Sequence, residues 1–385
     1  MKYRQFGKLD WKVSALGFGA MRLPTTDGKP ENIDEPLATR MIRYAIDHGV
    51  NYLDTAYPYH GGQSERVVGR ALKDGYREKI RLATKMPVRM VQSADDLDRI
   101  FAEQLARLQV DKIDSYLFHG MNVMNLLKLR EFNILKWAEG KMAKGNIDWL
   151  GFSFHDKYDV FKEVIDEYDN WTLCQIQYNF MDIDFQAGCR GVEYAAGKDL
   201  AVVVMEPLRG GMLGKEPPEA VSEVWASAPQ KYSQVEWALK WVWNQPEISL
   251  ALSGMSTMEQ VKQNVEYAGR SGANSLSADE EALIDRARIA YRGRIPISCT
   301  SCGYCMPCPN GVVIPRAFQI FNEAVMYDDP ERGRFRYSGR IGLKPEQMAD
   351  KCIECGECLE ACPQNIPIPD WMKKVHALLG QNQDK

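Results

Sequence analysis

Four side chains in the first third of the sequence could carry out chemistry together. Asp54, Lys85 and His119 each stand at the end of a short β-type run, and Tyr59 lies in a Gly-rich turn five residues after Asp54. An unperturbed phenol is a poor proton donor near neutral pH, but a nearby ammonium group favours the phenolate and lowers the phenol pKa. An acid can hold that ammonium in place. These residue types therefore predict proton transfer to an oxygen atom.

Each of the four residues also has an ordinary structural explanation. Asp54 could cap a helix, Lys85 could reach the surface with its charged end, His119 could be a satisfied loop histidine, and Tyr59 could be a packed aromatic. Only elements that bring the four together would favour chemistry over these alternatives.

Those elements are predicted by an alternation of short β-rich runs with amphipathic stretches. A hairpin at 3–6 and 12–19 leads into the first barrel strand. The later runs are 51–54, 80–85, 113–119, 147–153, 173–178, 201–205 and 248–253. Eight such units within about 270 residues predict an α/β fold of the TIM-barrel type, (β/α)8, with its functional residues at the carboxyl ends of the strands. A doubly wound sheet is the alternative, but no G-x-G-x-x-G follows the first strand.

The motifs around these residues resemble those of the aldo-keto reductases. The sequence has the family pattern DTAxxY at Asp54 to Tyr59, ATK ending at Lys85, and LFH ending at His119. The resemblance covers residues 1–290. It implies NAD(P)H-linked reduction of a small-molecule carbonyl, or the reverse oxidation of an alcohol. In that reaction Tyr59 would donate the proton, Lys85 and Asp54 would tune it, and His119 would orient the carbonyl.

Nucleotide contacts are expected from the same resemblance and from the loops after strands seven and eight, where barrels bind phosphate. In the second loop Ser256 and Glu259 are spaced as a capping box. The expected contacts are Ser153, Gln175, Met205, Leu208, Arg209, Gly210, Gly254, Ser256, Gln260 and Asn264. Phe154 replaces the usual Asn, Met205 replaces an aromatic, and Gln260 replaces an arginine for the 2′-phosphate. Because only Arg209 is a nearby replacement, the choice between NADPH and NADH stays open.

Eight of the ten cysteines form two tight groups near the C-terminus. They are Cys299, Cys302, Cys305 and Cys308, followed by Cys352, Cys355, Cys358 and Cys362. The second group has the bacterial ferredoxin spacing, and the first deviates from it by one residue. We expect two [4Fe-4S] clusters in which Cys308 and Cys362 exchange places as fourth ligands. Zinc is the alternative, but it usually takes two separated C-x-x-C pairs. The other two cysteines, Cys174 and Cys189, are expected to be buried thiols.

The C-terminal part, 291–385, is expected to be a small, mainly helical ferredoxin-like domain with a helix at 316–327. A basic stretch at 332–340 is expected to be a solvated loop that could dock an acidic redox partner. Nicotinamide passes two electrons as hydride and clusters pass them singly, so a bound flavin is a candidate intermediary. The whole resembles a subfamily that fuses a reductase barrel to a ferredoxin-like tail.

Composition bounds the remaining possibilities. The 385 residues are 45% hydrophobic and 26% charged, with a net charge of −4. No long basic run favours nucleic acid or an anionic membrane, and no signal peptide or run of eighteen apolar residues is found, so we expect a cytoplasmic protein. Two functions remain: a carbonyl reductase with electron-carrying clusters, and an electron-transfer or nucleotide-sensing protein with little turnover.

Overall fold

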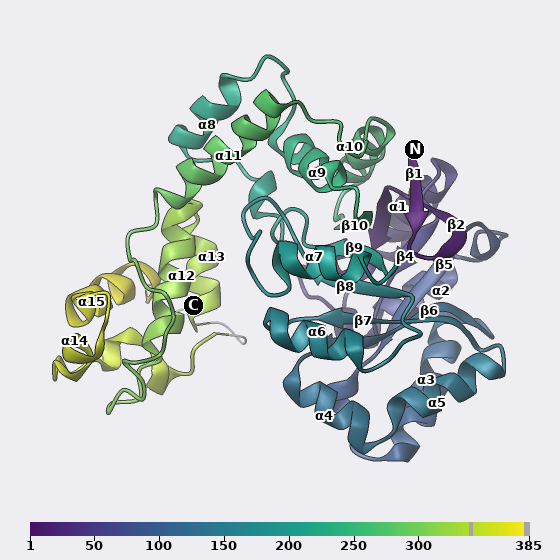
Figure 1. The fold of residues 1–385 in the computed structure, drawn as a ribbon, viewed down its shortest axis with the longest axis horizontal. Helices are drawn as coiled ribbons and strands as arrows, with labels where there is room; N and C mark the ends of the chain where they lie inside the picture. Colours follow the sequence, from purple (N-terminus) through teal and green to yellow (C-terminus); the bar gives the residue numbers. More distant parts are fainter. Residues whose placement is uncertain (339–341, 381–385) are drawn as a thin grey trace. The chain divides into compact units, whose positions relative to one another are not determined.

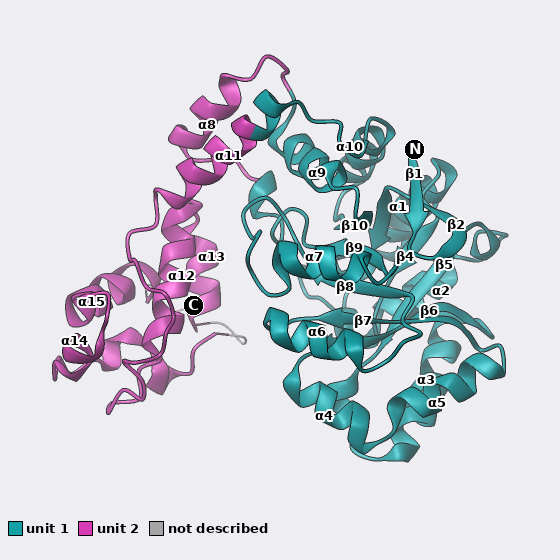
Figure 2. Cartoon of the chain, viewed as in Figure 1, with its two compact units in different colours: residues 1–214, 232–281 teal, residues 215–231, 282–385 magenta. Residues whose placement is uncertain are grey.

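The chain divides into two compact units in the computed structural model, which describes residues 1–338 and 342–380 (Figures 1 and 2). Unit 1 comprises Met1–Gly214 and Tyr232–Glu281, and unit 2 comprises Lys215–Lys231 and Ala282–Lys385. The expected boundary at residue 290 lies inside helix α11 (Ala278–Arg292), which begins in unit 1 and ends in unit 2. The division into domains at that residue stays a prediction.

Unit 1 is built on a closed barrel of eight strands in the order β10-β3-β4-β5-β6-β7-β8-β9. The strands are β3 Leu16–Gly19, β4 Tyr52–Asp54, β5 Arg81–Met86, β6 Ile113–Met121, β7 Ile147–Phe154, β8 Leu173–Gln177, β9 Ala201–Met205 and β10 Ile248–Gly254. All neighbouring pairs are parallel. The TIM-barrel prediction is confirmed, and closure of the sheet rules out the doubly wound alternative.

The hairpin of β1 (Tyr3–Phe6) and β2 (Leu9–Ser14) packs against the amino-terminal ends of the barrel strands. The Phe6 ring lies 5.8 Å from that of Tyr52, at the start of β4, and 6.0 Å from that of Trp149 in β7. Phe6 is fully buried in a cluster that includes residues beginning β8 and β9. Because the hairpin fills this end with aromatic rings, the carboxyl end is left for a ligand.

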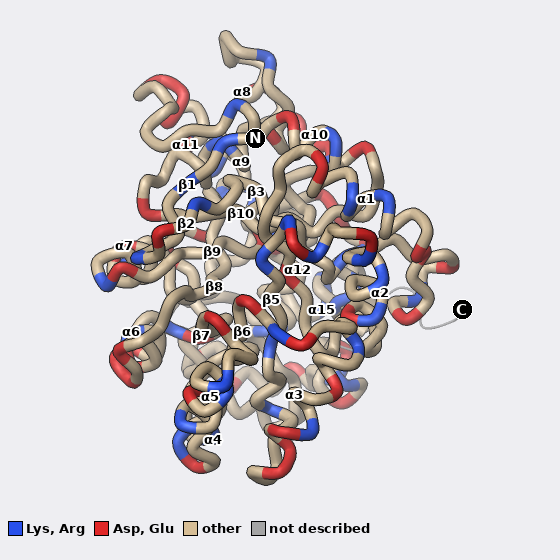
Figure 3. Tube along the Cα trace, turned by 90° about the vertical axis from the view of Figure 1, so that its right-hand side faces the viewer, with Lys and Arg blue, Asp and Glu red and all other residues tan. Residues whose placement is uncertain are grey.

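Helices surround the barrel (Figure 1). Those up to α9 lie in the connections between consecutive strands, and α10 follows the last strand, β10. Those of unit 1 are α1 Glu35–Asp47, α2 Ser64–Ala71, α3 Ala94–Leu108, α4 Val123–Glu131, α5 Ile134–Ala143, α6 Tyr158–Asp166, α7 Gly188–Ala196, α9 Gln234–Asn244 and α10 Met258–Gly269. Local signals place their ends. Asp34 caps α1 by accepting from the Leu37 N–H at 3.0 Å, and Ser93 begins α3 with a capping box. Acidic and basic positions are interspersed along these helices (Figure 3).

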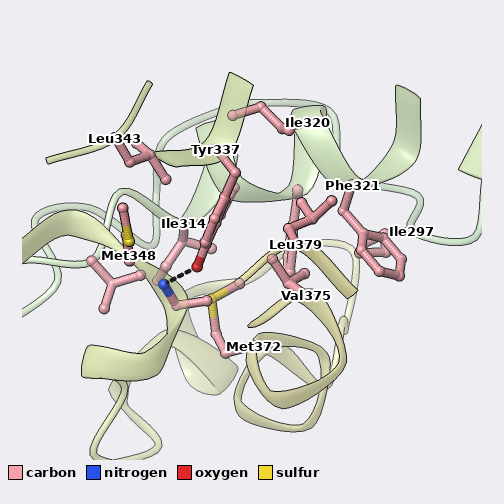
Figure 4. Packing of buried hydrophobic residues seen from close by; sticks show 14 of the residues in the cluster. Ile297, Ile314, Ile320, Phe321, Tyr337, Leu343, Met348, Met372, Val375 and Leu379 are labelled. Atoms are coloured by element: carbon pink, nitrogen blue, oxygen red, sulfur yellow. Dashed lines mark hydrogen bonds between the residues drawn. The ribbon is translucent and has the colours of Figure 1, made fainter. Parts of the chain in front are cut away.

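Unit 2 is mainly helical and has its own apolar core. Its helices are α8 Glu219–Ala226, most of α11, α12 Ile314–Met326, α13 Pro330–Ser338, α14 Glu357–Ala361 and α15 Ile368–Leu379. Residues of α12, α13 and α15 pack together around the fully buried Tyr337 (Figure 4). The Tyr337 hydroxyl accepts from the Ala349 N–H at 2.6 Å, which satisfies its buried oxygen.

Residues 332–338 of the basic stretch belong to helix α13 and do not form the expected solvated loop. The last two residues of the stretch, Gly339 and Arg340, lie outside the described residues. Arg336 pairs with Glu323 of α12, and Arg334 donates to the Leu378 carbonyl at 3.1 Å. The sequence could not predict this because the partners lie on other helices.

Among the described residues, no helix is both long and apolar enough to cross a membrane.

The close contact between α2 and α3 gives a test of the packing. A Cβ at Gly69 would lie 2.4 Å from the Leu108 carbonyl oxygen, whereas a Cβ at Gly140 of α5 would meet nothing within 4 Å. We expect Gly69→Ala to destabilise the protein by about 1–3 kcal/mol, because backbone must move. Gly140→Ala is the matched control and should stabilise it by about 0.5–1 kcal/mol, since alanine favours a helix. The midpoint temperatures of thermal unfolding of the two variants check this. Equal midpoints would contradict the close packing of α2 against α3.

Candidate functional site

Three neighbouring strands carry the polar side chains at the carboxyl end of the barrel. Asp54 is the last residue of β4, while Lys85 and His119 lie near the ends of β5 and β6. The parallel register pairs Asp54 with Ala83 and Lys85 with Leu117, so the residues emerge at one end of the barrel. The structure therefore brings together the side chains that the sequence singled out, and Tyr59 joins them from the following loop.

The Lys85 ammonium is the centre of this group. Its Nζ donates to Asp54 Oδ1 at 2.5 Å, to the Thr55 carbonyl at 2.8 Å and to the Tyr59 hydroxyl at 3.3 Å. The Lys85 and Asp54 side chains are 1% and 2% exposed. The rings of Tyr59 and His119 meet edge to face, with centroids 5.8 Å apart. A buried cation is thus held against both an acid and a phenol.

Burial and charge compete in setting the pKa values here. Burial would lower the pKa of Lys85, but Asp54 and Tyr59 outweigh it and raise that pKa above its ordinary value. Burial raises the pKa of Asp54 and also that of Tyr59, and Lys85 opposes both shifts without cancelling them. The expected net lowering of the Tyr59 pKa is therefore wrong, since sequence alone does not measure burial. The phenol keeps its proton through neutral pH.

His119 is an uncharged imidazole in this environment. Burial lowers its pKa to about 3, and the nearby positive charge of Lys85 acts in the same direction. A neutral imidazole has one N–H to donate, so His119 can offer a hydrogen bond to a ligand oxygen without bringing a second cation beside Lys85.

The loop that carries Tyr59 is held from both sides. Tyr59 begins a 3-10 turn, Tyr59–Gly62, in which His60 takes a left-handed conformation with φ 53°. His60 Nδ1 lies 2.6 Å from the Pro30 carbonyl, and its Nε2 accepts from the Leu23 N–H at 3.1 Å. This pattern requires the proton on Nδ1. The imidazole thus links the turn to the segment that follows β3.

A buried carboxylate fixes the other side of the loop. Glu65 of α2 accepts from the Thr84 hydroxyl at 2.7 Å and from the Gln104 amide at 2.8 Å, and Arg107 of α3 lies 3.3 Å from its second oxygen. The Arg107 guanidinium also stacks over the Tyr57 ring at 4.0 Å. Because Glu65 is fully buried, it needs all these donors. This network joins α2, β5 and α3 around the loop.

A cavity of about 250 Å³ opens beside these groups. Asp54, Tyr59, Lys85 and His119 all line it. Two buried oxygens here, Asp54 Oδ2 and Gln175 Oε1, make no hydrogen bond of ordinary geometry among the described residues. Burial raises the pKa of the Asp54 carboxyl group, but the Gln175 side chain acts on that pKa in the lowering direction, so the Asp54 oxygen has a neighbour that can satisfy it. Buried polar atoms are normally satisfied, so Gln175 Oε1 indicates that a ligand with a hydrogen-bond donor belongs in the cavity.

Six of the ten expected nucleotide contacts line this cavity. They are Ser153, Gln175, Met205, Leu208, Gly210 and Gly254. Ser153 Oγ accepts from the Gly120 N–H at 2.8 Å, which leaves its own hydrogen available to donate.

The other four expected contacts do not line the cavity. Arg209 Nε donates to Asp182 at 2.9 Å, and Asn264 donates to the Ser253 hydroxyl at 3.1 Å. Gln260 Oε1 accepts from the Ser256 N–H at 2.8 Å, so both of those residues are engaged at the start of α10. The expected capping box of Ser256 and Glu259 is also wrong.

The cap of α10 is Thr257, whose hydroxyl accepts from the Gln260 N–H at 3.2 Å. Thr257 stands one position closer to the helix and is also a good capping residue, so the sequence pattern was ambiguous by one residue.

Four polar residues of the cavity are not among the expected contacts: Arg22, His155, Glu206 and Ser253. His155 could have been found, because it lies two residues beyond Ser153 along the same strand direction and alternate strand residues share a face. Phe154, between them, is fully buried and packs against Phe161 with ring centroids 5.0 Å apart. The departure at Phe154 therefore lies outside the cavity wall.

In unit 2 the cysteines line two further cavities. One, of about 150 Å³, is lined by Cys308, Cys352, Cys355 and Cys358, together with Cys305. The other, of about 20 Å³, is lined by Cys299, Cys302, Cys305 and Cys362. These are the two sets of four that exchange of the last cysteine in each run predicts. The residues present therefore fit two thiolate-bound clusters.

A single metal ion fits the same residues less well. Within residues 1–338 and 342–380, no three His, Cys, Asp or Glu side chains are grouped so as to hold one metal ion. A structural zinc site needs four ligands at about 2.0–2.3 Å from one ion, whereas a cluster contributes its own iron and sulfide and holds its cysteines further apart. Cys174 is buried as expected, and Cys189 is only half-buried.

Comparison with known families gives two matches along the chain. The aldo/keto reductase family matches residues 15–289, and a 4Fe-4S dicluster domain matches residues 298–366. The first match covers the barrel, and the second covers both cysteine groups.

Individual relatives agree with the first match. L-galactose dehydrogenase from Arabidopsis thaliana is 30% identical over 303 residues, which is 74% of this chain and 92% of that protein. An oxidoreductase of Bacillus subtilis, YqkF, is 26% identical over 73% of this chain and 94% of its own.

Among solved structures, the holo form of aldo-keto reductase AKR11C1 from Bacillus halodurans superposes with a TM-score of 0.62. It is 31% identical over 74% of this chain and 96% of its own. An aldo-keto reductase from Klebsiella pneumoniae in complex with NADPH shares the fold, with a TM-score of 0.58 and 24% identity over 74% of this chain and 94% of its own.

The barrel, its strand-end residues and these matches lead to one conclusion. The chain belongs to the aldo/keto reductase family of oxidoreductases, and a 4Fe-4S dicluster domain follows the reductase barrel in the same chain.

Proposed function

We propose that the barrel reduces the carbonyl group of a small molecule with NADH or NADPH, or oxidises the alcohol in reverse. The observation that carries the proposal is the buried Lys85 ammonium, which contacts both Asp54 and the Tyr59 hydroxyl at the wall of a cavity. A binding protein has no need for a phenol paired with a buried cation. A nucleotide-sensing protein with little turnover is therefore the weaker alternative.

In this mechanism Tyr59 donates its proton to the oxygen that becomes an alcohol. The proton is present because burial raises the pKa of the phenol. Lys85 stabilises the phenolate left behind, and Asp54 keeps Lys85 charged and in place. His119, as a neutral imidazole, donates a hydrogen bond that orients the carbonyl oxygen. A nicotinamide, when bound, supplies the hydride.

The cavity wall supports binding of a carboxamide near these groups. Gln175 Oε1 is a buried acceptor without a partner among the described residues, and the Ser153 hydroxyl hydrogen is free to donate. Together they match the N–H and C=O groups of an amide. Met205 lines the same cavity and offers an apolar surface to an aromatic ring.

The dicluster domain would hold two [4Fe-4S] clusters with exchanged fourth ligands. One would use Cys299, Cys302, Cys305 and Cys362, and the other Cys308, Cys352, Cys355 and Cys358. Such clusters pass single electrons. Their natural role in this protein is electron transfer, with an external redox protein as the partner.

Two expectations about this electron transfer are less well supported than before. Two arginines of α13 are engaged, Arg336 by Glu323 and Arg334 by the Leu378 carbonyl. α13 therefore offers less positive charge to an acidic partner than the sequence suggested. No comparison supports a flavin, and the proposed function does not include one.

The role of Tyr59 is tested by Tyr59→Phe, with Tyr57→Phe as the matched control. Tyr57 lies two residues away but donates to Glu103 and does not line the cavity. Turnover of a panel of aldehydes and ketones should fall by about a hundredfold or more in Tyr59→Phe, because the proton donor is lost. Nucleotide affinity should be nearly unchanged. Comparable turnover in the two variants would reject the mechanism.

The pH profile of reduction tests the coupling of Tyr59 to Lys85. Tyr59 acts as an acid, so the rate should hold through neutral pH and fall as the pH rises through the phenol pKa, which burial raises above 10.0. In the double variant Lys85→Met/Asp54→Asn, which leaves no buried charge unpaired, this limb should move to higher pH. The reason is that Lys85 affects the Tyr59 pKa more strongly than Asp54 does. If the rate of the double variant falls at the same high pH as that of the unmodified protein, Tyr59 is not the group that causes this fall.

Metal analysis tests the clusters and their ligands. Protein purified without oxygen should be brown and hold about eight iron and eight sulfide per chain, as two cubane clusters require. Under exchanged ligation, Cys308→Ala and Cys355→Ala damage the same cluster, so the double variant should lose only about four iron. Cys308→Ala with Cys302→Ala should lose about eight. The reverse pattern would assign Cys308 to the first cluster. Finding zinc in stoichiometric amount, without sulfide, would contradict the presence of clusters. Cys189→Ala is the neutral control.

A further inference from the structure

Arg22 has a defined place at the edge of the barrel cavity. It follows β3 and lines the cavity beside Gly254, the last residue of β10. A Cβ on Gly254 would lie 3.3 Å from Cβ, Cγ and Cδ of Arg22, so the arginine stem fills the space that the glycine leaves. The Ser256 hydroxyl donates to the Arg22 carbonyl at 2.8 Å and fixes the backbone. Arg22 is thus an exposed side chain at the cavity, and its stem packs beside Gly254.

The charge of Arg22 is available to a ligand. Within the described residues, Arg22 and Lys85 are the only Lys or Arg side chains that line this cavity, and Lys85 is held by Asp54. The two residues expected to meet phosphate are engaged elsewhere. Arg209 is paired with Asp182, and Gln260, which carries no charge, accepts from the Ser256 N–H. No hydrogen bond or ion pair of the Arg22 guanidinium occurs among the described residues.

The opposite part of the cavity wall indicates what else the ligand carries. Gln175, which is 2% exposed, has an unpartnered oxygen among the described residues and lies on β8, and Arg22 lies beyond the end of β3. A ligand that satisfies both has an uncharged N–H donor at one end and an anionic group at the other. A nicotinamide dinucleotide has this arrangement, with its amide and its phosphates.

We propose that Arg22 binds a phosphate group of the dinucleotide and thereby supplies the positive charge that Gln260 lacks. A guanidinium suits phosphate because its N–H groups form two parallel hydrogen bonds with the oxygens, each strengthened by charge. The 2′-phosphate and the diphosphate share this chemistry. The inference rests on the proposed function, because it requires that the barrel bind the nucleotide.

Titration of the holoprotein with NADPH and with NADH, followed by tryptophan fluorescence in the absence of carbonyl substrate, tests the proposal. Arg22→Ala should raise the Kd of at least one nucleotide by about tenfold or more, the effect of losing a hydrogen bond to a charged group. Arg22→Lys should restore part of the affinity, since it keeps the charge without the two parallel bonds. Arg66→Ala removes an exposed arginine of α2 outside the cavity and should change nothing.

The two nucleotides separate the two phosphates. A loss confined to NADPH assigns Arg22 to the 2′-phosphate, and an equal loss for both assigns it to the diphosphate. If Arg22→Ala binds both as tightly as the unmodified protein, the proposal is overturned. It is overturned also if only the KM of the carbonyl substrate rises, which would assign Arg22 to a substrate anion. If the unmodified protein binds neither nucleotide, the proposed function fails and this inference fails with it.

Discussion

The ion pair between Lys85 and Asp54 is the interaction on which the barrel site depends. Removing two charges from water is costly, and their attraction offsets this only when the remaining hydrogen bonds are also made. Here the three hydrogens of the Lys85 ammonium have three acceptors, namely Asp54, the Thr55 carbonyl and Tyr59. The same contacts that make the buried cation tolerable therefore hold the phenol. The structural requirement and the proposed chemistry coincide in one set of hydrogen bonds.

The rest of unit 1 serves to keep that geometry. A closed barrel holds β4 and β5 in fixed register, so Asp54 and Lys85 cannot drift apart without breaking the sheet. The intervening loop is less constrained by the sheet, and it is held instead by His60 on one side and by the buried Glu65 network on the other. The N-terminal hairpin fills the opposite end of the barrel with apolar side chains. Rigidity is thus concentrated where the four side chains meet.

Unit 2 is stabilised in a different way from the barrel. Its core is a small apolar cluster around Tyr337 (Figure 4). Six of the eight cysteines lie half-buried against that cluster, and the other two, Cys302 and Cys355, are exposed. Irregular loops such as 298–313 have few backbone hydrogen bonds of their own and depend on other constraints. Metal ligation can supply them, because ligands fixed by a cluster contribute binding free energy to folding. The two electron carriers of the proposed function, a nicotinamide for pairs and clusters for single electrons, would thus be held by two kinds of scaffold.

The sequence by itself determined seven of the eight barrel strands to within about two residues. It did not separate the first strand, β3 at 16–19, from the hairpin strand β2 at 9–14, because the whole run 12–19 is β-like. It also determined the position of Asp54, Lys85 and His119 at strand ends, that of Tyr59 in the loop after Asp54, and the division of the cysteines into two sets. These features rest on period and spacing, which are local properties of a chain. Only the tertiary structure decided that burial outweighs Lys85 in setting the pKa of Tyr59, that α13 is a helix with its Arg336 paired to Glu323, and that Arg22 lines the cavity. Burial and pairing between distant segments depend on how elements pack, and no local pattern encodes that.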